Sequence, residues 1–302
     1  MNMKKHRNKR IVMLCLVVAL LTCQMLQPMV ASATDEVTVM TYSFTQLYTA
    51  LKNAEDGDVI GITGGIFDIN PIESFGFTDK HITIRRMDSS ACLRIQSPNM
   101  TFQNITFDGN GIDGKSAFVL TGGNITFKDC VFKDCLTSTA NGGAVYVMNQ
   151  TPTFDNCTFD SNTAVQGGHM YVAGGTVTIR NCTFTNGHAL SDGGAIKSIP
   201  KAPAKCAVSS STITGNSAAL YGGGISTTGY MSITDTKIFN NTAPGGGADI
   251  ARFSYEFNMN GDIETLVDLY STDGILPIAW VNDYNADSGI TVPDGYDPES
   301  VN

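Results

Sequence analysis

Basic residues are scarce in this chain of 302 residues, which has 19 Lys and Arg against 28 Asp and Glu. Five of the basic residues lie between positions 4 and 10, in a segment that we expect to be removed, which leaves 14 basic residues and a net charge of about −14. Such a surface repels phosphate backbones and anionic membranes, and no basic stripe interrupts it. The composition therefore argues against nucleic acid as a partner.

The chain also lacks a second long apolar segment. Its one long apolar run, residues 11–26, follows the basic positions and precedes Ala31, Ser32 and Ala33. This order is typical of a secretory signal peptide, so we expect cleavage after Ala33 and a mature chain that is secreted or held at the extracellular surface, with no membrane span. An uncleaved membrane anchor is the alternative, but a spanning helix needs roughly 20 apolar residues and this run is shorter.

Motifs for metal binding are absent as well. No two cysteines form a CxxC pair, and no Cys/His spacing matches a zinc site. An even number of cysteines follows the signal peptide, which permits disulfides in an exported protein. Three of them recur at one position of a repeat, however, and cannot all pair within it, so we expect a mostly reduced, buried column. The six cysteines are Cys92, Cys130, Cys135, Cys157, Cys182 and Cys206, of which Cys130, Cys157 and Cys182 form the column.

The chain is rich in repetition between about residues 100 and 250, with a period of about 25 residues. The phrases TPTFDNCTFDSN and TVTIRNCTFTN, which begin at Thr151 and Thr176, are two of the copies. Aligning the copies gives three apolar columns. The first holds Phe102, Phe127, Phe154, Ile179, Val208 and Ile233, the second Phe107, Phe132, Phe159, Phe184, Ile213 and Ile238, and the third, which mostly follows a glycine pair, Phe118, Val145, Met170, Ile196 and Ile225.

Within each copy the apolar residues alternate with polar ones, which is typical of short β-strands. The step from Ile179 to Cys182 is odd, so both side chains face inward only if the chain bends between them. Short polar residues that tolerate tight backbone geometry occupy the bend. In successive copies they are Asp129, Asn156, Asn181, Ser210 and Asp235.

Short strands joined by tight bends at this period predict that the chain coils. Each copy then forms one turn, and equivalent positions stack about 4.8 Å apart in parallel sheets along the axis. The predicted fold class is therefore all-β, a parallel β-helix or solenoid of roughly seven or eight coils.

Both ends of such a coil are open sheet edges that need a cover. Residues 43–46 have the form of a capping box, and apolar residues at helical spacing follow to Leu51, so we expect an amphipathic cap helix before the first coil. Ile263, Leu266, Val267 and Tyr270 favour a short helix over the last coil, and the chain from Trp280 onward favours a loop or tail. The predicted segments are a signal peptide at 1–33, cap helix and turn at 34–58, β-helix at 59–252, and C-terminal cap and tail at 253–302.

Two phrases of the repeat are similar to those of a known family. Residues 142–145 and 193–196 match GGA[ILV], and residues 107–110 and 159–162 match FxxN. With them the chain resembles the polymorphic outer membrane protein family over about half of its length. The resemblance implies a right-handed parallel β-helix of the pectin-lyase-like superfamily, displayed outside the cell and used for adhesion. That family's C-terminal membrane barrel has no counterpart here, so a secreted relative or passenger-like domain is the expected form.

The fold alone does not separate an adhesin from an enzyme, because it also carries polysaccharide lyases and hydrolases. A lyase needs carboxylates for calcium beside a Lys or Arg base, and a hydrolase needs paired carboxyl groups. The outward charges Lys128, Asp155, Asp160 and Arg180 do not gather by sign. The sequence therefore predicts no catalytic residue, cofactor or metal site. An adhesin-like protein that binds host-cell or polysaccharide surfaces is favoured, and a polysaccharide lyase or glycoside hydrolase is the alternative.

Two histidines are further candidates for a site. His169 stands where other copies have Ala or Gly, and His188 lies four residues before Asp192. A His/Asp catalytic pair is one interpretation. The other places both histidines at coil corners, in contact with solvent or with local hydrogen-bond partners.

Threonines on the outward side form ranks that the core does not require. We expect them to stack from coil to coil as a regular array, which could bind an ordered lattice such as a polysaccharide surface or ice. The alternative is that threonine simply suits exposed strands. The residues are Thr101, Thr126, Thr151, Thr153, Thr176 and Thr178.

Overall fold

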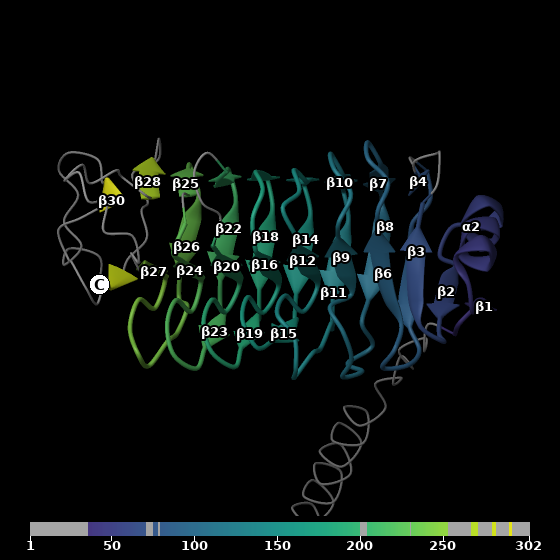
Figure 1. Cartoon of the computed structure of the whole chain (residues 1–302), viewed down its shortest axis with the longest axis horizontal. Coiled ribbons are helices and arrows are strands. Elements are labelled where there is room, and N and C mark those ends of the chain that lie inside the picture. Colours follow the sequence, from purple (N-terminus) through teal and green to yellow (C-terminus); the bar gives the residue numbers. More distant parts are fainter. Residues whose placement is uncertain are drawn as a thin grey trace, which may run out of the picture. The chain divides into compact units, whose positions relative to one another are not determined.

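The computed structural model describes residues 36–70, 75–77, 79–199, 204–229, 231–252, 267–270, 280–281 and 290–291. Over these residues the chain is an all-β parallel solenoid of about eight turns, with one short helix near its N-terminus (Figure 1). The predicted fold class is confirmed. The predicted signal peptide and most of the predicted C-terminal tail lie outside the described residues.

Three long sheets run along the solenoid, and each coil contributes one strand to each sheet. Sheet A contains β1 (Val39–Thr41), β2 (Val59–Ile62), β5 (Ile82–Arg86), β8 (Ile105–Asp108), β11 (Val131–Lys133), β14 (Thr158–Asp160), β18 (Thr183–Thr185), β22 (Thr212–Thr214) and β26 (Lys237–Phe239). Sheet B contains β3 (Ile66–Ile69), β6 (Cys92–Ile95), β9 (Phe118–Leu120), β12 (Val145–Val147), β16 (Met170–Val172), β20 (Ile196–Ser198), β24 (Ile225–Thr227), β27 (Ile250–Arg252) and β29 (Trp280–Val281).

Sheet C precedes sheet A in each coil, and a short sheet D follows sheet A in the middle coils. Sheet C contains β4 (Phe75–Gly76), β7 (Thr101–Gln103), β10 (Thr126–Lys128), β13 (Thr153–Asp155), β17 (Val177–Arg180), β21 (Cys206–Ser209), β25 (Met231–Thr234), β28 (Val267–Tyr270) and β30 (Ile290–Thr291). Sheet D contains β15 (Thr163–Ala164), β19 (His188–Ala189) and β23 (Ser217–Ala218).

The inward columns are the ones that the repeat predicts. Phe159 pairs in register with Phe132 on one side and Phe184 on the other. Its ring centroid lies 4.6 Å from that of Phe132 and 4.5 Å from that of Phe184, and the planes are within 5° of parallel. All three rings are fully buried. The core is therefore a stack of equivalent side chains, held in place by the strand register.

Two left-handed bends shape each coil from β11 to β26. The predicted bend residues between sheets C and A have φ between 48° and 56°, a conformation that Asn, Asp and glycine adopt most readily. A second set of left-handed residues follows sheet A, and the repeat pattern did not identify it. It comprises Asp134, Ser161, Asn186, Gly215 and Asn240.

The cysteine column lies just inside the first bend. All six described cysteines are buried free thiols, which agrees with the expected reduced column. The backbone N–H of Cys157 donates to Cys182 Sγ at 3.4 Å, and the N–H of Cys182 donates to Ser211 Oγ at 3.0 Å. Because each side chain accepts from the coil before it, cysteine and serine fill the same role.

The cap helix forms as predicted, as α2 (Phe44–Asn53). Ser43 Oγ accepts from the N–H of Gln46, and Gln46 Oε1 accepts from the N–H of Tyr42, which together satisfy donors at the helix start. Leu47 and Leu51 are buried in the core of the first coil. The helix therefore covers an end of the stack that would otherwise be open (Figure 1).

The C-terminal prediction needs a correction. Val267 and Tyr270 belong to strand β28, in which Val267 pairs with Met231 and Leu269 with Ile233, so this segment is not a helix. Trp280 starts β29, which pairs with β27. Strand pairing thus continues past residue 252, while Ile263 and Leu266 lie outside the described residues.

Candidate functional site

The outer face of sheet C carries the predicted threonine rank. Thr126 pairs in register with Thr101 and Thr153, and Thr153 pairs with Thr178, so four threonines occupy one row on successive coils. All four are half-buried. The row ends at Ala207, the partner of Thr178 on the next coil. The stacking of these threonines is therefore confirmed, and their binding role stays a prediction.

Charged residues beside the threonines pair between neighbouring coils. Arg180 Nη2 lies 2.9 Å from Asp155 Oδ2 on sheet C, and this hydrogen bond is the main reason that the pKa of Asp155 is lowered. On sheet A, Asp108 Oδ2 lies 2.9 Å from Arg85 Nη2 and 3.6 Å from Lys133 Nζ. Opposite charges are thus paired between neighbouring coils on both faces.

The outward row of sheet B has a different character. Tyr146 and Tyr171, on consecutive coils, stack with ring centroids 5.3 Å apart and planes 15° from parallel. Tyr171 is buried and Tyr146 is half-buried, so Tyr146 is the accessible end of the stack. In register order, the row comprises Arg94, Val119, Tyr146, Tyr171, Lys197, Ser226 and Ala251. We call these residues the tyrosine row.

A buried ion pair follows the tyrosine stack. Lys197 Nζ lies 3.2 Å from Asp192 Oδ2 and donates to Ser226 Oγ at 2.9 Å, and the lysine side chain is only 7% exposed. Burial lowers the pKa of Lys197, although the charge of Asp192 acts in the opposite direction. The second carboxylate oxygen, Asp192 Oδ1, is buried without a hydrogen-bond partner among the described residues. Such an incompletely satisfied group is costly to bury, which marks this position as unusual for a purely structural one.

The other end of the tyrosine row carries a more exposed charge. Arg94 Nη2 donates to Asp68 Oδ2 at 2.7 Å, and the Arg94 side chain is 37% exposed. Val119 separates Arg94 from Tyr146 in the row. Because neighbouring strands lie about 4.8 Å apart, Arg94 and Tyr146 flank the short Val119 side chain at a separation of about 10 Å.

Neither histidine is hydrogen-bonded to Asp192, the proposed partner in a His/Asp pair. His169 is fully buried, with Nδ1 2.8 Å from Asn162 Nδ2 and Nε2 3.0 Å from Asn216 Oδ1. His188 is exposed, and its Nδ1 lies 2.9 Å from Ser217 Oγ. Asp192 contacts Lys197 instead. His188 therefore lies exposed at a coil corner with a local hydrogen-bond partner, as the second interpretation of the histidines predicts. His169 lies in the interior and not in solvent.

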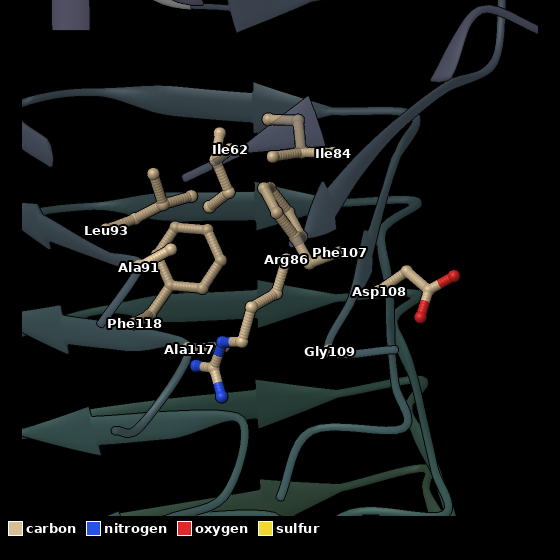
Figure 2. Close-up of a pocket in the computed structure, with 10 residues that line it drawn as sticks. All are labelled: Ile62, Ile84, Arg86, Ala91, Leu93, Phe107, Asp108, Gly109, Ala117 and Phe118. Atoms are coloured by element: carbon tan, nitrogen blue, oxygen red, sulfur yellow. The ribbon is translucent and has the colours of Figure 1, made fainter. Parts of the chain in front are cut away.

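A small cavity lies inside the first coils. It lies between apolar side chains, and the buried Arg86 extends from it (Figure 2). Arg86 donates to the carbonyl oxygens of Lys115 at 2.6 Å and Ile112 at 3.3 Å, while Asp108 points away from the cavity in Figure 2. The Arg86 guanidinium is thus hydrogen-bonded to backbone carbonyl groups. The enclosed space is too small for a sugar ring. The lining residues are Ile62, Ile84, Arg86, Ala91, Leu93, Phe107, Asp108, Gly109, Ala117 and Phe118.

Among the described residues, no group of three or more His, Cys, Asp or Glu side chains is placed to hold a metal ion. None of the helices in this part of the chain has the length and apolar character of a membrane span.

Comparison with known proteins supports the fold and leaves the function open. Residues 60–184 match the family described as "Right handed beta helix region". No curated protein sequence matches the chain. The resemblance to polymorphic outer membrane protein repeats stays a prediction.

Two solved structures are similar at low identity. One, a pectate lyase Pel9A, is 11% identical, with 85% of this chain and 79% of that chain covered and a TM-score of 0.29. The other, a mutant of the PL6 family alginate lyase AlyGC, is 14% identical, with 84% of this chain covered, 39% of that chain covered and a TM-score of 0.30. These values carry no argument about activity, and this chain spans well under half of the alginate lyase.

Sequence analysis missed the tyrosine row although the signal was present. The phrases GGAVYV, GGHMYV and GGAIKS place Tyr146, Tyr171 and Lys197 directly after the third inward column. Alternation along a strand points these residues outward, in register with one another. The burial of Lys197 and its contact with Asp192 required the structure.

Proposed function

We propose that this chain is an exported, adhesin-like β-helix protein that binds polysaccharide along the outer face of sheet B. The observation that carries the proposal is the Tyr146–Tyr171 stack, which ends in a half-buried ring with charged residues on the same row. Aromatic surfaces with a few placed polar groups are typical of small-molecule and sugar sites. The signal-like N-terminus and the GGA[ILV] and FxxN phrases support export and display. The acidic charge supports a partner other than nucleic acid.

The space over Val119 suits a flat sugar ring. A ring that packs on the face of Tyr146 toward Val119 lies about 3.5 to 4.0 Å from it, which leaves about 6 Å to the level of Arg94. Hydroxyl or carboxylate oxygens of the ring could then accept from the partly exposed Arg94 guanidinium. Because parallel sheets continue this geometry along the axis, an extended polysaccharide would run along the row.

The test is binding to a glycan array and to insoluble polysaccharides. Tyr146→Ala is expected to weaken binding at least about tenfold, because it removes the ring on which the sugar packs. Tyr42→Ala is the matched control, since Tyr42 is 62% exposed and lies beside the cap helix, away from the tyrosine row. Equal losses in the two variants, or no binding to any glycan by the unaltered protein, would contradict the proposal.

A polysaccharide lyase or hydrolase is the second candidate, and Lys197 is the observation that favours it. Burial lowers its pKa, which favours the neutral amine, the form that can accept a proton. Against this, the amine is held by Asp192 and Ser226 and is shielded from solvent. We expect the purified protein, with calcium, to release neither reducing ends nor unsaturated uronides from polygalacturonate. Turnover that disappears in Lys197→Gln would establish the enzyme instead.

A further inference from the structure

Buried asparagines form a regular series inside the second bend of the coils. Asn162, Asn216 and Asn241 occupy equivalent positions, where two other coils have Cys135 and Gly187. The amide oxygens of Asn162, Asn216 and Asn241 accept from the backbone N–H of the residue at this position on the preceding coil, at 2.8 to 3.0 Å. Their Nδ2 atoms donate to the carbonyls of Phe132, Phe184 and Ile213, at 2.9 to 3.0 Å. Two backbone groups therefore fix the orientation of each amide.

Gly187 interrupts this series, and His169 fills the interruption. Asn216 Nδ2 also donates to the asparagine of the next coil, Asn241, at 2.9 Å, but Asn162 has no such neighbour because Gly187 has no side chain. The His169 ring lies there instead, and a Cβ on Gly187 would come 2.5 Å from His169 Nε2. The neighbouring coils have Ala144 and Ala195 in place of His169. The imidazole thus bridges Asn162 and Asn216 across the coil that lacks an asparagine.

The surrounding amides determine which nitrogen of His169 carries the proton. Asn162 presents its N–H to Nδ1, so Nδ1 must be unprotonated, and Asn216 presents its oxygen to Nε2, so Nε2 must carry hydrogen. A second proton, on Nδ1, would face the N–H of Asn162. Turning the Asn162 amide to accept it would break the bonds to the N–H of Cys135 and the carbonyl of Phe132.

We propose that His169 is an acid-sensitive element that links the coils of Asn162 and Asn216 only while its imidazole is neutral. The ring also lies between Phe159 and Phe184, with centroid separations of 6.1 and 5.8 Å, where a cation is poorly solvated. Protonation therefore costs both a hydrogen bond and desolvation. The proposal is independent of the polysaccharide site.

The neighbouring charged groups are hydrogen-bonded to other residues, although the charge of Asp160 and the backbone of Thr185 favour the protonated imidazole. Asp160, on β14, accepts from Thr185 and Asn186, and Asp249, at the start of β27, accepts from Asn241. His188, on β19, is exposed and contacts Ser217, and the buried Cys135 thiol is neutral because burial raises its pKa to about 12. Neither carboxylate is hydrogen-bonded to the imidazole.

The pKa of His169 follows the same geometry. Burial lowers it from 6.5 to about 4, although the Asn216 oxygen and the Asp160 charge favour the protonated form. A group whose pKa is lower in the folded than in the unfolded chain stabilises the fold when the pH is above the pKa of the unfolded chain. That contribution is lost as the pH falls toward the pKa of the folded chain. For His169 the loss runs from about pH 6.5 down to about pH 4.

The test compares thermal unfolding of three proteins between pH 7.5 and pH 4. His169→Gln keeps an acceptor and a donor near the two ring nitrogens but does not titrate. The Tm of the unaltered protein is expected to fall by roughly 5 to 10 °C more than that of His169→Gln over this range. His188→Gln, the control at an exposed histidine, should follow the unaltered protein. Parallel curves for the unaltered protein and His169→Gln would overturn the proposal.

A second measurement decides the matter if His169→Gln does not fold. Nitrogen-15 chemical shifts of the unaltered protein should show Nδ1 unprotonated and Nε2 protonated throughout the folded range. Protection of the Gly187 and Cys135 amides, which donate to Asn216 and Asn162, should fall before that of the phenylalanine coils as the pH drops. A His169 ring that becomes charged above pH 6 while the chain stays folded would overturn the proposal.

Discussion

The coils between Phe102 and Phe184 and the coils after them fill the same cross-section in different ways. In the earlier coils stacked phenylalanine rings fill the interior, as at Phe127 and Phe154, whose centroids are 5.0 Å apart. In the later coils isoleucine and valine take those positions, and buried polar side chains join them. The buried polar residues described after Phe184 are Lys197, Ser198, Ser211, Asn216, Ser226, Thr227, Thr236, Asn241 and Asp249.

The strand register does not change between the two regions. Phe184 pairs with Ile213, and Ile213 pairs with Ile238, so the second inward column continues although the residue type changes. Strand pairing and the left-handed bends therefore determine the shape of each coil. Either stacked rings or hydrogen-bonded side chains can fill its interior. The family match over residues 60–184 ends where the phenylalanines end.

The largest expected effect comes from breaking the phenylalanine region. Phe159→Asp removes a ring that stacks on both sides and buries a charge, so we expect a loss of about 5 kcal/mol or more in the free energy of unfolding. Thr158→Asp, at the neighbouring outward position, should cost far less. Denaturant unfolding of both variants measures the difference, and similar losses would mean that the inward column is wrongly assigned.

Breaking the polar region should cost somewhat less. Asn216→Ala removes the acceptor for the Gly187 N–H and for His169 Nε2, and a donor to the Phe184 carbonyl. Leaving buried groups unpaired should lower the free energy of unfolding by roughly 3 kcal/mol. Thr212→Ala, on the outer face of the same coil, is the control and should change it little. If both variants unfold at the same denaturant concentration, the asparagine series does not hold the later coils together.

The smallest effect is expected from the outer face, where the two regions should not differ. Replacing Thr153 and Thr178 with lysine should leave the Tm nearly unchanged, because both side chains face outward and are half-buried. Binding to an insoluble polysaccharide should persist if the tyrosine row is the site. Loss of retention, or loss of an ability to suppress ice growth, would instead assign lattice binding to the threonine rank.

The columns and first bend could be predicted because each residue there repeats its neighbour on the next coil. Phe132, Phe159 and Phe184 share a role that one alignment reveals, and Asn156 and Asn181 share another. Two features lay beyond that method. The second bend was missed because the inward residue that follows it is polar in several coils, as at Asn162 and Asn216, so no odd step between apolar residues marks it. Val267 to Tyr270 fits helical spacing and strand alternation equally well until pairing with β25 decides.

The candidate sites were predicted less well, because they depend on departures from the repeat. His169 was identified as unusual, but its role follows from the missing side chain at Gly187 on the next coil. Lys197 was not identified, because only the structure shows that an outward residue is buried against Asp192. Repetition predicts what neighbouring coils share, whereas the sites proposed above rest on residues that one coil has alone.

The in-register stacking of coils also has a consequence for how the chain folds. Phe159 and Phe184 are separated by 25 residues, and every long sheet repeats steps of about this size. Contacts of this span are less than a tenth of the chain length, a relative contact order as low as that of helical bundles, although parallel sheets usually fold slowly. Folding should therefore begin where two or three neighbouring coils first associate, and then add one coil at a time in both directions.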